Sequence, residues 1–331
     1  MRLTRILEAA LFALCTLAVS ASLTACATQL PPQIAGVSEN AERGGSWMLP
    51  EASGEDLIYA TSTSGNAIYA FSYPTGKLVG KIVPPSGTIS LQGLCADNLG
   101  YFYVTSFSGR HGGHGAAGHL YKYRHGATRP KTDFTFGGTE PFGCAFDATT
   151  KTLAVSAISL GVTAGFVETI PISGSGKIYY SYYVSNYYYC GYDDKGNLFV
   201  NGTGAGPVMY LEELRKGASG LKELALNRSL SDSAIGQVQW DGRNITLEDL
   251  TDSALLRLSI SGSKAKVVGT THLDGWYDAT LSWLNGSTLL VPTGGKNTKL
   301  GFWNYPSGGK ATRLVDAPAG LFSVTVSAPA K

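Results

Sequence analysis

Cys190-Gly-Tyr-Asp-Asp-Lys-Gly-Asn-Leu-Phe-Val200 is the stretch of the chain that predicts its fold. Its two ends, Tyr192 and residues 198–200, are typical of β-strands. The Asp, Gly and Asn residues between them offer the side-chain hydrogen bonds and positive φ angles of a tight hairpin turn. The same pattern recurs four more times, at residues 95–104, 144–155, 238–247 and 281–291. We therefore expect one strand–turn–strand unit to be repeated along the chain.

Length and composition predict an all-β protein. The chain has 331 residues, of which 44% are hydrophobic, so it can bury a substantial core. Its 42 Gly and 18 Tyr residues, with few long runs of helix formers, indicate many short strands joined by tight turns. The formal net charge of +2 comes from scattered residues and not from a basic stripe. The sequence therefore predicts no nucleic-acid partner.

Six copies of the unit fit into the chain after Asp56. Apolar residues in the second strand of each copy mark spacings of 45, 51, 45, 47 and 44, and they are Leu57, Phe102, Leu153, Leu198, Ile245 and Leu289. Copies continue into a third and a fourth strand, as at residues 67–71 and 77–83. Four antiparallel strands per ~45 residues are typical of a β-propeller blade, because one such sheet cannot bury both faces alone. We expect a six-bladed propeller.

The two ends of the repeat region are complementary. The first copy begins directly at its second strand, near Leu57, and lacks an innermost one. The last stretch, Pro318-Ala-Gly-Leu-Phe-Ser-Val-Thr-Val326, matches the innermost strand Pro141-Phe-Gly-Cys-Ala-Phe146. We therefore expect the C-terminal strand to complete the first blade and close the ring. A stray terminal strand would explain neither the missing innermost strand of the first copy nor the extra strand at the end of the chain.

The N-terminus has the layout of an export signal. Arg2 and Arg5 precede an apolar run at residues 9–19 that is too short for a stable membrane span. Leu23-Thr-Ala-Cys26 then resembles the bacterial lipobox, in which the cysteine is lipidated, whereas the alternative is an ordinary signal peptide cut after an Ala. We expect a signal peptide at residues 1–25, a lipidated Cys26 with a Pro- and Gly-rich tether at 26–53, and the propeller at 54–331.

This arrangement predicts a bacterial cell-envelope protein that its lipid anchors to a membrane. By resemblance to sorted lipoproteins, the non-acidic Ala27 implies the outer membrane. Trp47, Met48 and Leu49 in the tether are candidates to dock on the folded body. We expect the body to be a monomer.

The repeat, best seen in residues 190–200, resembles the six-bladed propellers of the NHL-repeat and SMP-30/gluconolactonase groups and similar bacterial lipoproteins. The resemblance covers residues 56–327 and rests on strands and turns, so it implies architecture more than activity. The lactonase group uses carboxylate and amide oxygens that converge on a divalent ion in the channel. Glu140, Asn186 and Asp278 are the candidates here, and the family's ligands do not map residue by residue.

Three cysteines, Cys95, Cys144 and Cys190, fall on expected innermost strands. An odd number in an exported protein raises the question of a disulfide. Equivalent strands of neighbouring blades are expected ~10 Å apart with side chains pointing the same way, which is too far for a bridge. We therefore expect three buried free thiols.

Four histidines cluster in and after a Gly-rich insertion of the second copy, at His111, His114, His119 and His125. Imidazoles at such spacings can ligate Zn, Cu or Ni, so the first three are weak metal candidates. No Cys or carboxylate accompanies them in the sequence, and ordering a Gly-rich loop costs entropy. A surface loop is the simpler interpretation.

The loops that enter the innermost strands should converge on one end of the central channel. By register, the candidate ligand-binding residues of this rim are Glu140, Phe142, Asn186, Tyr188, Tyr277 and Asp278. Tyrosine rings beside carboxylate and amide oxygens suit a sugar or another small polar ligand. The opposite end should carry turn residues such as Asp97, Asp147 and Asp193, whose repetition is explained by turn formation.

Two functions are compatible with these patterns. The first is a membrane-tethered binding or scaffolding module for a protein, glycan or small ligand; the second is a metal-dependent hydrolase of the lactonase type. No Gly-x-Ser-x-Gly nucleophile motif is present, and Gly174-Ser-Gly-Lys177 lacks the Ser or Thr and the helix of a phosphate loop. The sequence therefore assigns no catalytic residue and no cofactor.

Overall fold

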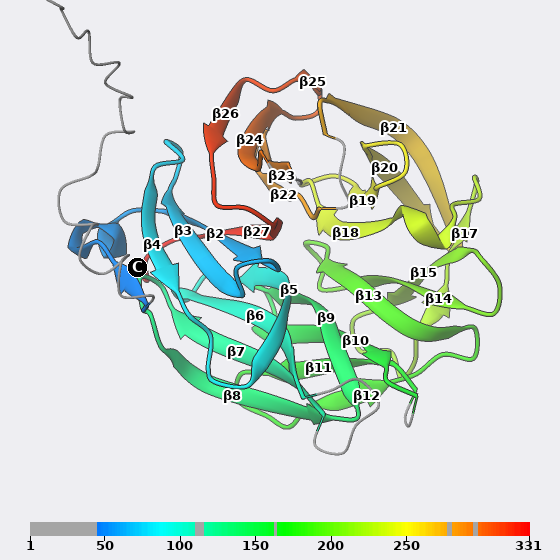
Figure 1. The fold of residues 1–331 in the computed structure, drawn as a ribbon. Helices are drawn as coiled ribbons and strands as arrows, with labels where there is room; N and C mark the ends of the chain where they lie inside the picture. Colours follow the sequence, from blue (N-terminus) through cyan, green and yellow to red (C-terminus); the bar gives the residue numbers. More distant parts are fainter. Residues whose placement is uncertain (1–44, 110–115, 162–163, 277–279, 294–296) are drawn as a thin grey trace, which may run out of the picture.

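The computed structural model describes residues 45–109, 116–161, 164–276, 280–293 and 297–331. These residues form six small, mainly antiparallel sheets. Figure 1 shows the sheets arranged around a common centre. The protein is a six-bladed β-propeller, as the repeat spacing predicted.

The first three blades follow one another in the chain and contain the following strands. Blade 1 consists of β27 (Leu321–Ser327), β2 (Leu57–Ser62), β3 (Ala67–Ser72), β4 (Leu78–Ile82) and β1 (Trp47–Met48). The 3₁₀ helix η1 (Pro50–Gly54) connects β1 to β2. Blade 2 consists of β5 (Thr88–Ala96), β6 (Tyr101–Ser108), β7 (Ala117–Arg124) and β8 (Pro130–Gly137). Blade 3 consists of β9 (Thr139–Asp147), β10 (Thr152–Ser159), β11 (Phe166–Pro171) and β12 (Lys177–Tyr179).

The second half of the ring repeats this order with additions in blade 5. Blade 4 consists of β13 (Val184–Tyr192), β14 (Leu198–Gly204), β15 (Met209–Leu214) and β16 (Lys222–Glu223). Blade 5 consists of β18 (Ile235–Trp240), β19 (Ile245–Asp249), β20 (Ala254–Ser261) and β21 (Lys264–Asp274), with β17 (Ala225–Leu226) and β25 (Gly309–Lys310) pairing parallel to β21, and with η2 (Asp232–Ala234) before β18. Blade 6 consists of β22 (Trp283–Asn285), β23 (Thr288–Thr293), β24 (Lys299–Asn304) and β26 (Arg313–Asp316).

The hairpin turns between the first and second strands of the blades have the chemistry that the sequence predicted. In blade 4, Asp193 Oδ1 accepts hydrogen bonds from the backbone N–H groups of Lys195 and Asn197. Gly196 takes a φ of 80°, which a residue with a side chain rarely adopts. The carboxylates of Asp97 and Asp147 accept equivalent backbone hydrogen bonds. These aspartates therefore build turns.

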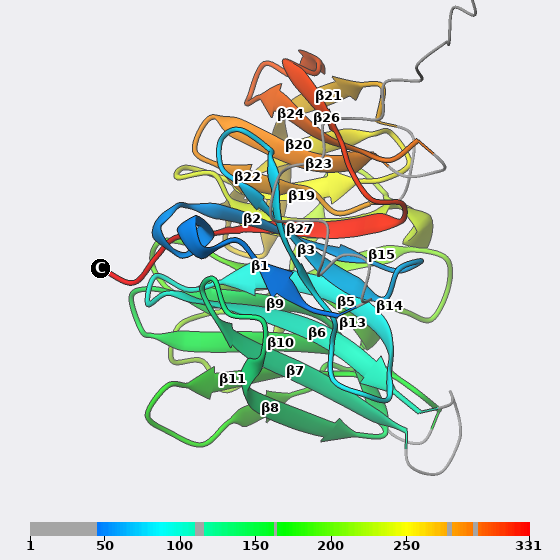
Figure 2. The ribbon, with the colours of Figure 1, turned by 60° about the vertical axis from the view of Figure 1, so that its left-hand side comes forward.

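The C-terminal strand closes the ring. β27 pairs antiparallel with β2 from Leu57↔Ser327 to Ser62↔Leu321, so the last strand of the chain is the innermost strand of the first blade. Figures 1 and 2 both show red β27 beside blue β2. On the outer edge of the same blade, β1 pairs with β4, and Trp47 is 7% exposed. The folded body thus includes residues that the sequence assigned to the tether.

A disulfide joins Cys95 to Cys144, with their Cα atoms 5.7 Å apart, so the expectation of three free thiols was wrong. The error lies in the register. Cys144 pairs with Val155, and its counterpart in blade 2, which pairs with Val104, is Leu94. Cys95 is one residue further on, so its side chain points to the opposite face of its strand and towards blade 3. The bond fastens blade 2 to blade 3.

Cys190 is the cysteine that remains free in the described part of the chain. Burial raises the pKa of its thiol to about 12. It is therefore a small apolar core residue, as expected for all three.

The seams between neighbouring blades share a device that the sequence analysis missed. Among the described residues, a polar side chain of the second strand contacts the main chain in or directly before the next blade's innermost strand at five of the six seams. We call these the seam residues, and they are Thr61, Thr105, Ser156, Asn201 and Glu248. Glycine permits the close approach, since a Cβ at Gly93 would lie 2.4 Å from the carbonyl oxygen of Phe142.

Within the described residues, no helix is long and apolar enough to cross a membrane.

Candidate functional site

The innermost strands begin at one end of the channel, which we call the upper end, and finish in the Asp turns at the lower end. Just inside the upper end, aromatic side chains narrow the channel. The rings of Phe142 and Tyr188, from blades 3 and 4, meet edge to face at 5.2 Å. The ring of Phe142 also meets the buried Tyr189 ring, with 6.2 Å between their centroids. Phe322 of β27 packs against the buried core cluster that includes Tyr189. We call the half-buried rings of Phe142 and Tyr188 the aromatic layer.

Polar groups lie at and just above the level of this layer, since Gln92 is the blade 2 counterpart of Phe142. Gln92 Nε2 donates to Glu140 Oε1 at 2.9 Å and to Ser90 Oγ at 2.8 Å. Glu140 is 3% exposed, and the seam residue Thr61 donates to the Gln92 carbonyl, which anchors the strand beneath the amide. Blades 2 and 3 thus bring an amide, a hydroxyl and a carboxylate together.

Asn186 sits next to this group. Its Oδ1 accepts the backbone N–H of Ser159 at 2.9 Å, and Ser159 follows Ile158, the strand partner of Glu140. The structure therefore brings together four of the six predicted rim residues, namely Glu140, Phe142, Asn186 and Tyr188. Tyr277 and Asp278 lie outside the described residues.

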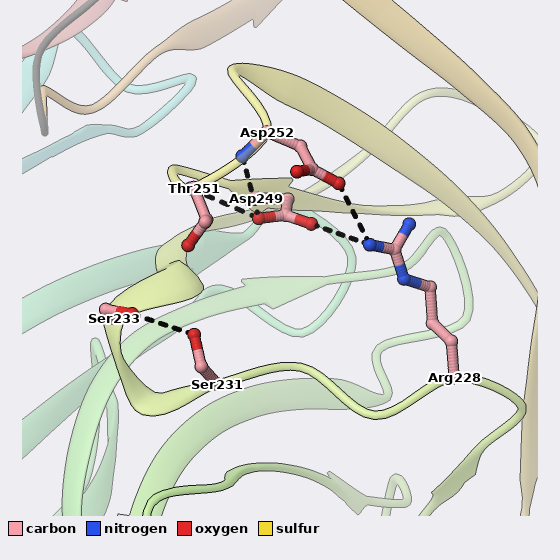
Figure 3. A network of polar contacts seen from close by, with 6 residues as sticks. All are labelled: Arg228, Ser231, Ser233, Asp249, Thr251 and Asp252. Atoms are coloured by element: carbon pink, nitrogen blue, oxygen red, sulfur yellow. Dashed lines mark hydrogen bonds and ion pairs between the residues drawn. The ribbon is translucent and has the colours of Figure 1, made fainter.

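A second polar network lies over the upper end of blade 5 (Figure 3). Arg228 donates to Asp249 at 3.3 Å and to Asp252 at 3.0 Å, while Asp249 Oδ1 also accepts the backbone N–H groups of Thr251 and Asp252. Burial raises the pKa of the Asp249 carboxyl, against the hydrogen bonds it accepts and the nearby Arg228 charge. In the loop before β18, the hydroxyls of Ser231 and Ser233 lie 2.7 Å apart in a hydrogen bond. These contacts tie the loop between blades 4 and 5 to the loop after β19.

The lower end of the channel is hollowed, which the sequence analysis did not anticipate. A cavity of about 200 Å³ opens there on the axis. Large side chains at the ends of the innermost strands line it, among them Phe146, Tyr192, Trp240 and Leu284. The signal in the sequence was the aromatic residue that precedes the Asp turn in blades 3, 4 and 5. Gln237 and Gln239 also line this cavity, so it combines aromatic and polar groups.

The histidines that the structure describes do not form a metal site. His119 uses both ring nitrogens, Nε2 with Ser108 and Nδ1 with Asp133. His125 is buried between Glu55 and Ser327, and burial lowers its pKa. His111 and His114 lie outside the described residues. In the described ranges, no three His, Cys, Asp or Glu side chains are placed to hold a metal ion.

Comparisons with solved structures agree with this architecture. A protein of unknown function from Bacteroides caccae superposes with a TM-score of 0.59 at 10% identity, covering 82% of this chain and 99% of the other. The likeness is one of fold. A "putative 6-phosphogluconolactonase" from Bacteroides uniformis gives 0.50 at 12% identity, with 80% and 83% covered. The Malassezia sympodialis allergen Mala s 1 gives 0.51 at 12% identity, with 75% and 89% covered. No protein-family model and no curated protein matches the chain.

Proposed function

We propose that the protein is an exported, lipid-anchored propeller that binds a small polar ligand, such as the end of a glycan, at the upper end of its channel. The observation that carries this proposal is the hydrogen-bonded group of Ser90, Gln92 and Glu140 beside the aromatic layer of Phe142 and Tyr188. Aromatic faces receive the C–H faces of a sugar, while amide and carboxylate oxygens accept its hydroxyl protons. The arrangement suits a hydroxyl-rich ligand.

The binding test is a titration against a panel of mono- and oligosaccharides, followed by calorimetry on the best one. We expect Tyr188→Ala to weaken binding by about 1 kcal/mol or more, because it removes part of the aromatic layer. Lys151→Glu and Lys195→Glu, at the turns of the lower end, are the matched controls and should leave the affinity unchanged. The reverse pattern would place the site at the wrong end.

A metal-dependent lactonase is the second candidate. Its support is Glu140 beside Asn186, a carboxylate and an amide of the kind that hold a divalent ion, and a distant fold neighbour bearing a lactonase name. Metal analysis of the purified soluble body separates the two proposals. A stoichiometric divalent ion, lost in Glu140→Gln but retained in Tyr188→Ala, would favour the enzyme.

Export and lipidation are supported by the lipobox at Cys26 and by the disulfide, because such bonds persist in oxidising compartments. We expect Cys26→Ser to move the protein from the membrane fraction to the soluble fraction without changing its melting temperature, since the anchor is covalent and outside the body. Retention of a cleaved Cys26→Ser protein in the membrane would contradict this part of the proposal.

A further inference from the structure

Three side chains of blade 2, on three consecutive strands, form a continuous hydrogen-bonded chain. Ser108 Oγ lies 2.8 Å from His119 Nε2, and His119 Nδ1 lies 3.0 Å and 3.1 Å from the two carboxylate oxygens of Asp133. They come from β6, β7 and β8, three adjacent strands of one sheet. A serine, a histidine and a carboxylate in this order are the components of an activated nucleophile.

The proton positions follow from what each group can do. The carboxylate of Asp133 only accepts, so the neutral imidazole carries its proton on Nδ1 and leaves Nε2 as an acceptor. Nε2 then accepts the hydroxyl proton of Ser108, whose other neighbour, the Ala117 carbonyl, is further away at 3.3 Å. This is the tautomer that a general base requires.

The imidazole is held in place by the sheet beneath it. Its ring stacks on Tyr121 at 5.4 Å with 14° between the planes. The Tyr121 hydroxyl is in turn fixed by a buried hydrogen bond of 3.0 Å to Thr88, the strand partner of Ser108. The base is therefore oriented before any substrate arrives.

The chain also has the exposure that a reaction needs. The side chain of His119 is 14% exposed and that of Asp133 is 43% exposed, and Ser108 is half-buried at the upper end of the blade. The three strands do not need these contacts to stay together, because their backbones pair along Tyr101–Ser108 and Ala117–Arg124. A purely structural role leaves the order Ser–His–Asp unexplained.

We propose that Ser108 is a nucleophile for small carboxylic esters, with His119 as its general base and Asp133 as a positioning residue. Ser108 Oγ attacks the acyl carbon while its proton passes to His119 Nε2, and the alcohol leaves with that proton. Water then attacks the acyl-serine, gives its proton to Nε2, and the acid departs as Ser108 recovers the proton. This reaction is independent of ligand binding at the channel.

The experiment uses the soluble body and two probes, a fluorophosphonate that labels activated serines and p-nitrophenyl acetate. Peptide mapping of the wild-type protein is expected to find the phosphonyl group on Ser108. His119→Asn should lower the labelling rate and ester hydrolysis about 100-fold or more, since a general base contributes 10²–10⁴. Ser108→Ala should abolish labelling at this peptide, and Ser307→Ala, which removes a different, exposed serine, should change neither rate.

Asp133 is tested by comparing two substitutions. Asp133→Asn should lower the hydrolysis rate, and Asp133→Glu should restore much of it, because a carboxylate and not merely a polar side chain is required. No label on the wild-type protein, label on another residue, or undiminished hydrolysis by Ser108→Ala would each overturn the proposal. Mapping of the unmutated protein decides the matter even if a variant fails to fold.

Discussion

The seams between blades are of two kinds, and the contrast shows how the ring is held. At five seams a seam residue crosses from a second strand to the next blade, as when Thr105 donates to the Phe142 carbonyl at 2.8 Å. At the sixth seam, between blades 6 and 1, the corresponding residue is Pro292, whose side chain donates nothing. A main-chain hydrogen bond crosses this seam, in which the Leu281 N–H donates to the Phe322 carbonyl at 2.7 Å.

The difference follows from the connectivity of the chain. Five seams join blades that are consecutive in the sequence. The connecting chain already holds these blades side by side, so a short polar contact only fixes the distance between them. The sixth joins the two ends of the chain, and its strength depends on β27 being present. The following predictions test this contrast.

Removal of the closing strand should have the largest effect. Deleting residues 321–331 exposes the edge of β2 and removes the buried Leu321 and Val324. We expect a loss of about 5 kcal/mol or more in unfolding free energy, measured by denaturant unfolding. The control lacks only Ala330 and Lys331 and should behave like the full body. A melting temperature of the long deletion within about a degree of that of the full body would refute closure.

The disulfide should come next. It closes a loop with a sequence separation of 49 residues, for which chain entropy predicts a contribution of about 4 kcal/mol. We expect the double variant Cys95→Ala/Cys144→Ala to lose about 2–4 kcal/mol of unfolding free energy, as is typical when a disulfide is removed. Cys190→Ala is the matched control and should cost only about 1 kcal/mol, because it removes a single buried sulfur. Equal losses would show that the bridge adds nothing beyond packing.

Glu248, the seam residue between blades 5 and 6, makes stability depend on pH. It accepts the backbone N–H groups of Gln237 at 2.8 Å and Ser282 at 2.9 Å, yet burial raises its pKa from 4.5 to about 7. The folded state thus binds this proton more tightly than the unfolded state. The stabilisation that protonated Glu248 adds to the folded state is complete below pH 4.5, and it is lost as the pH rises through about 7.

We expect this group to account for a decrease of up to about 3 kcal/mol in unfolding free energy between pH 4.5 and pH 8. Glu248→Gln, which mimics the protonated acid, should remove that part of the pH dependence. Denaturant unfolding of both proteins at the two pH values gives the difference directly. The same pH dependence in both would show that Glu248 does not titrate in this range.

Loss of one neutral seam contact should have the smallest effect. Thr105→Val preserves the shape of the side chain but leaves the Phe142 carbonyl without this donor, so we expect a loss of about 1–2 kcal/mol. Thr149→Val, on an exposed turn, should change the unfolding free energy by less than about 0.5 kcal/mol. A Thr105→Val protein as stable as the wild type would mean that the seam residues only fill space.

Register explains which features could be predicted. The strands and turns follow from local patterns, such as Asp193 and Gly196 between apolar runs, and the number of blades follows from their spacing. The seam residues were also visible in principle, as one polar residue after five of the six Leu-x-Val-like runs, for example Asn201. The pairing of Cys95 with Cys144 was not, because a shift of one residue reverses the direction of a side chain in a strand.

The sequence by itself determined an all-β chain of six blades, the turn chemistry at each repeat and the closure by the last strand, because these depend on periodicities of a few to about 45 residues. Only the tertiary structure decided what the blades bring together: the aromatic layer of Phe142 and Tyr188, the cavity at the lower end, and the Ser108–His119–Asp133 chain. Each consists of residues from different strands or blades. Their proximity is set by strand register and by the curvature of the ring, which no local pattern records.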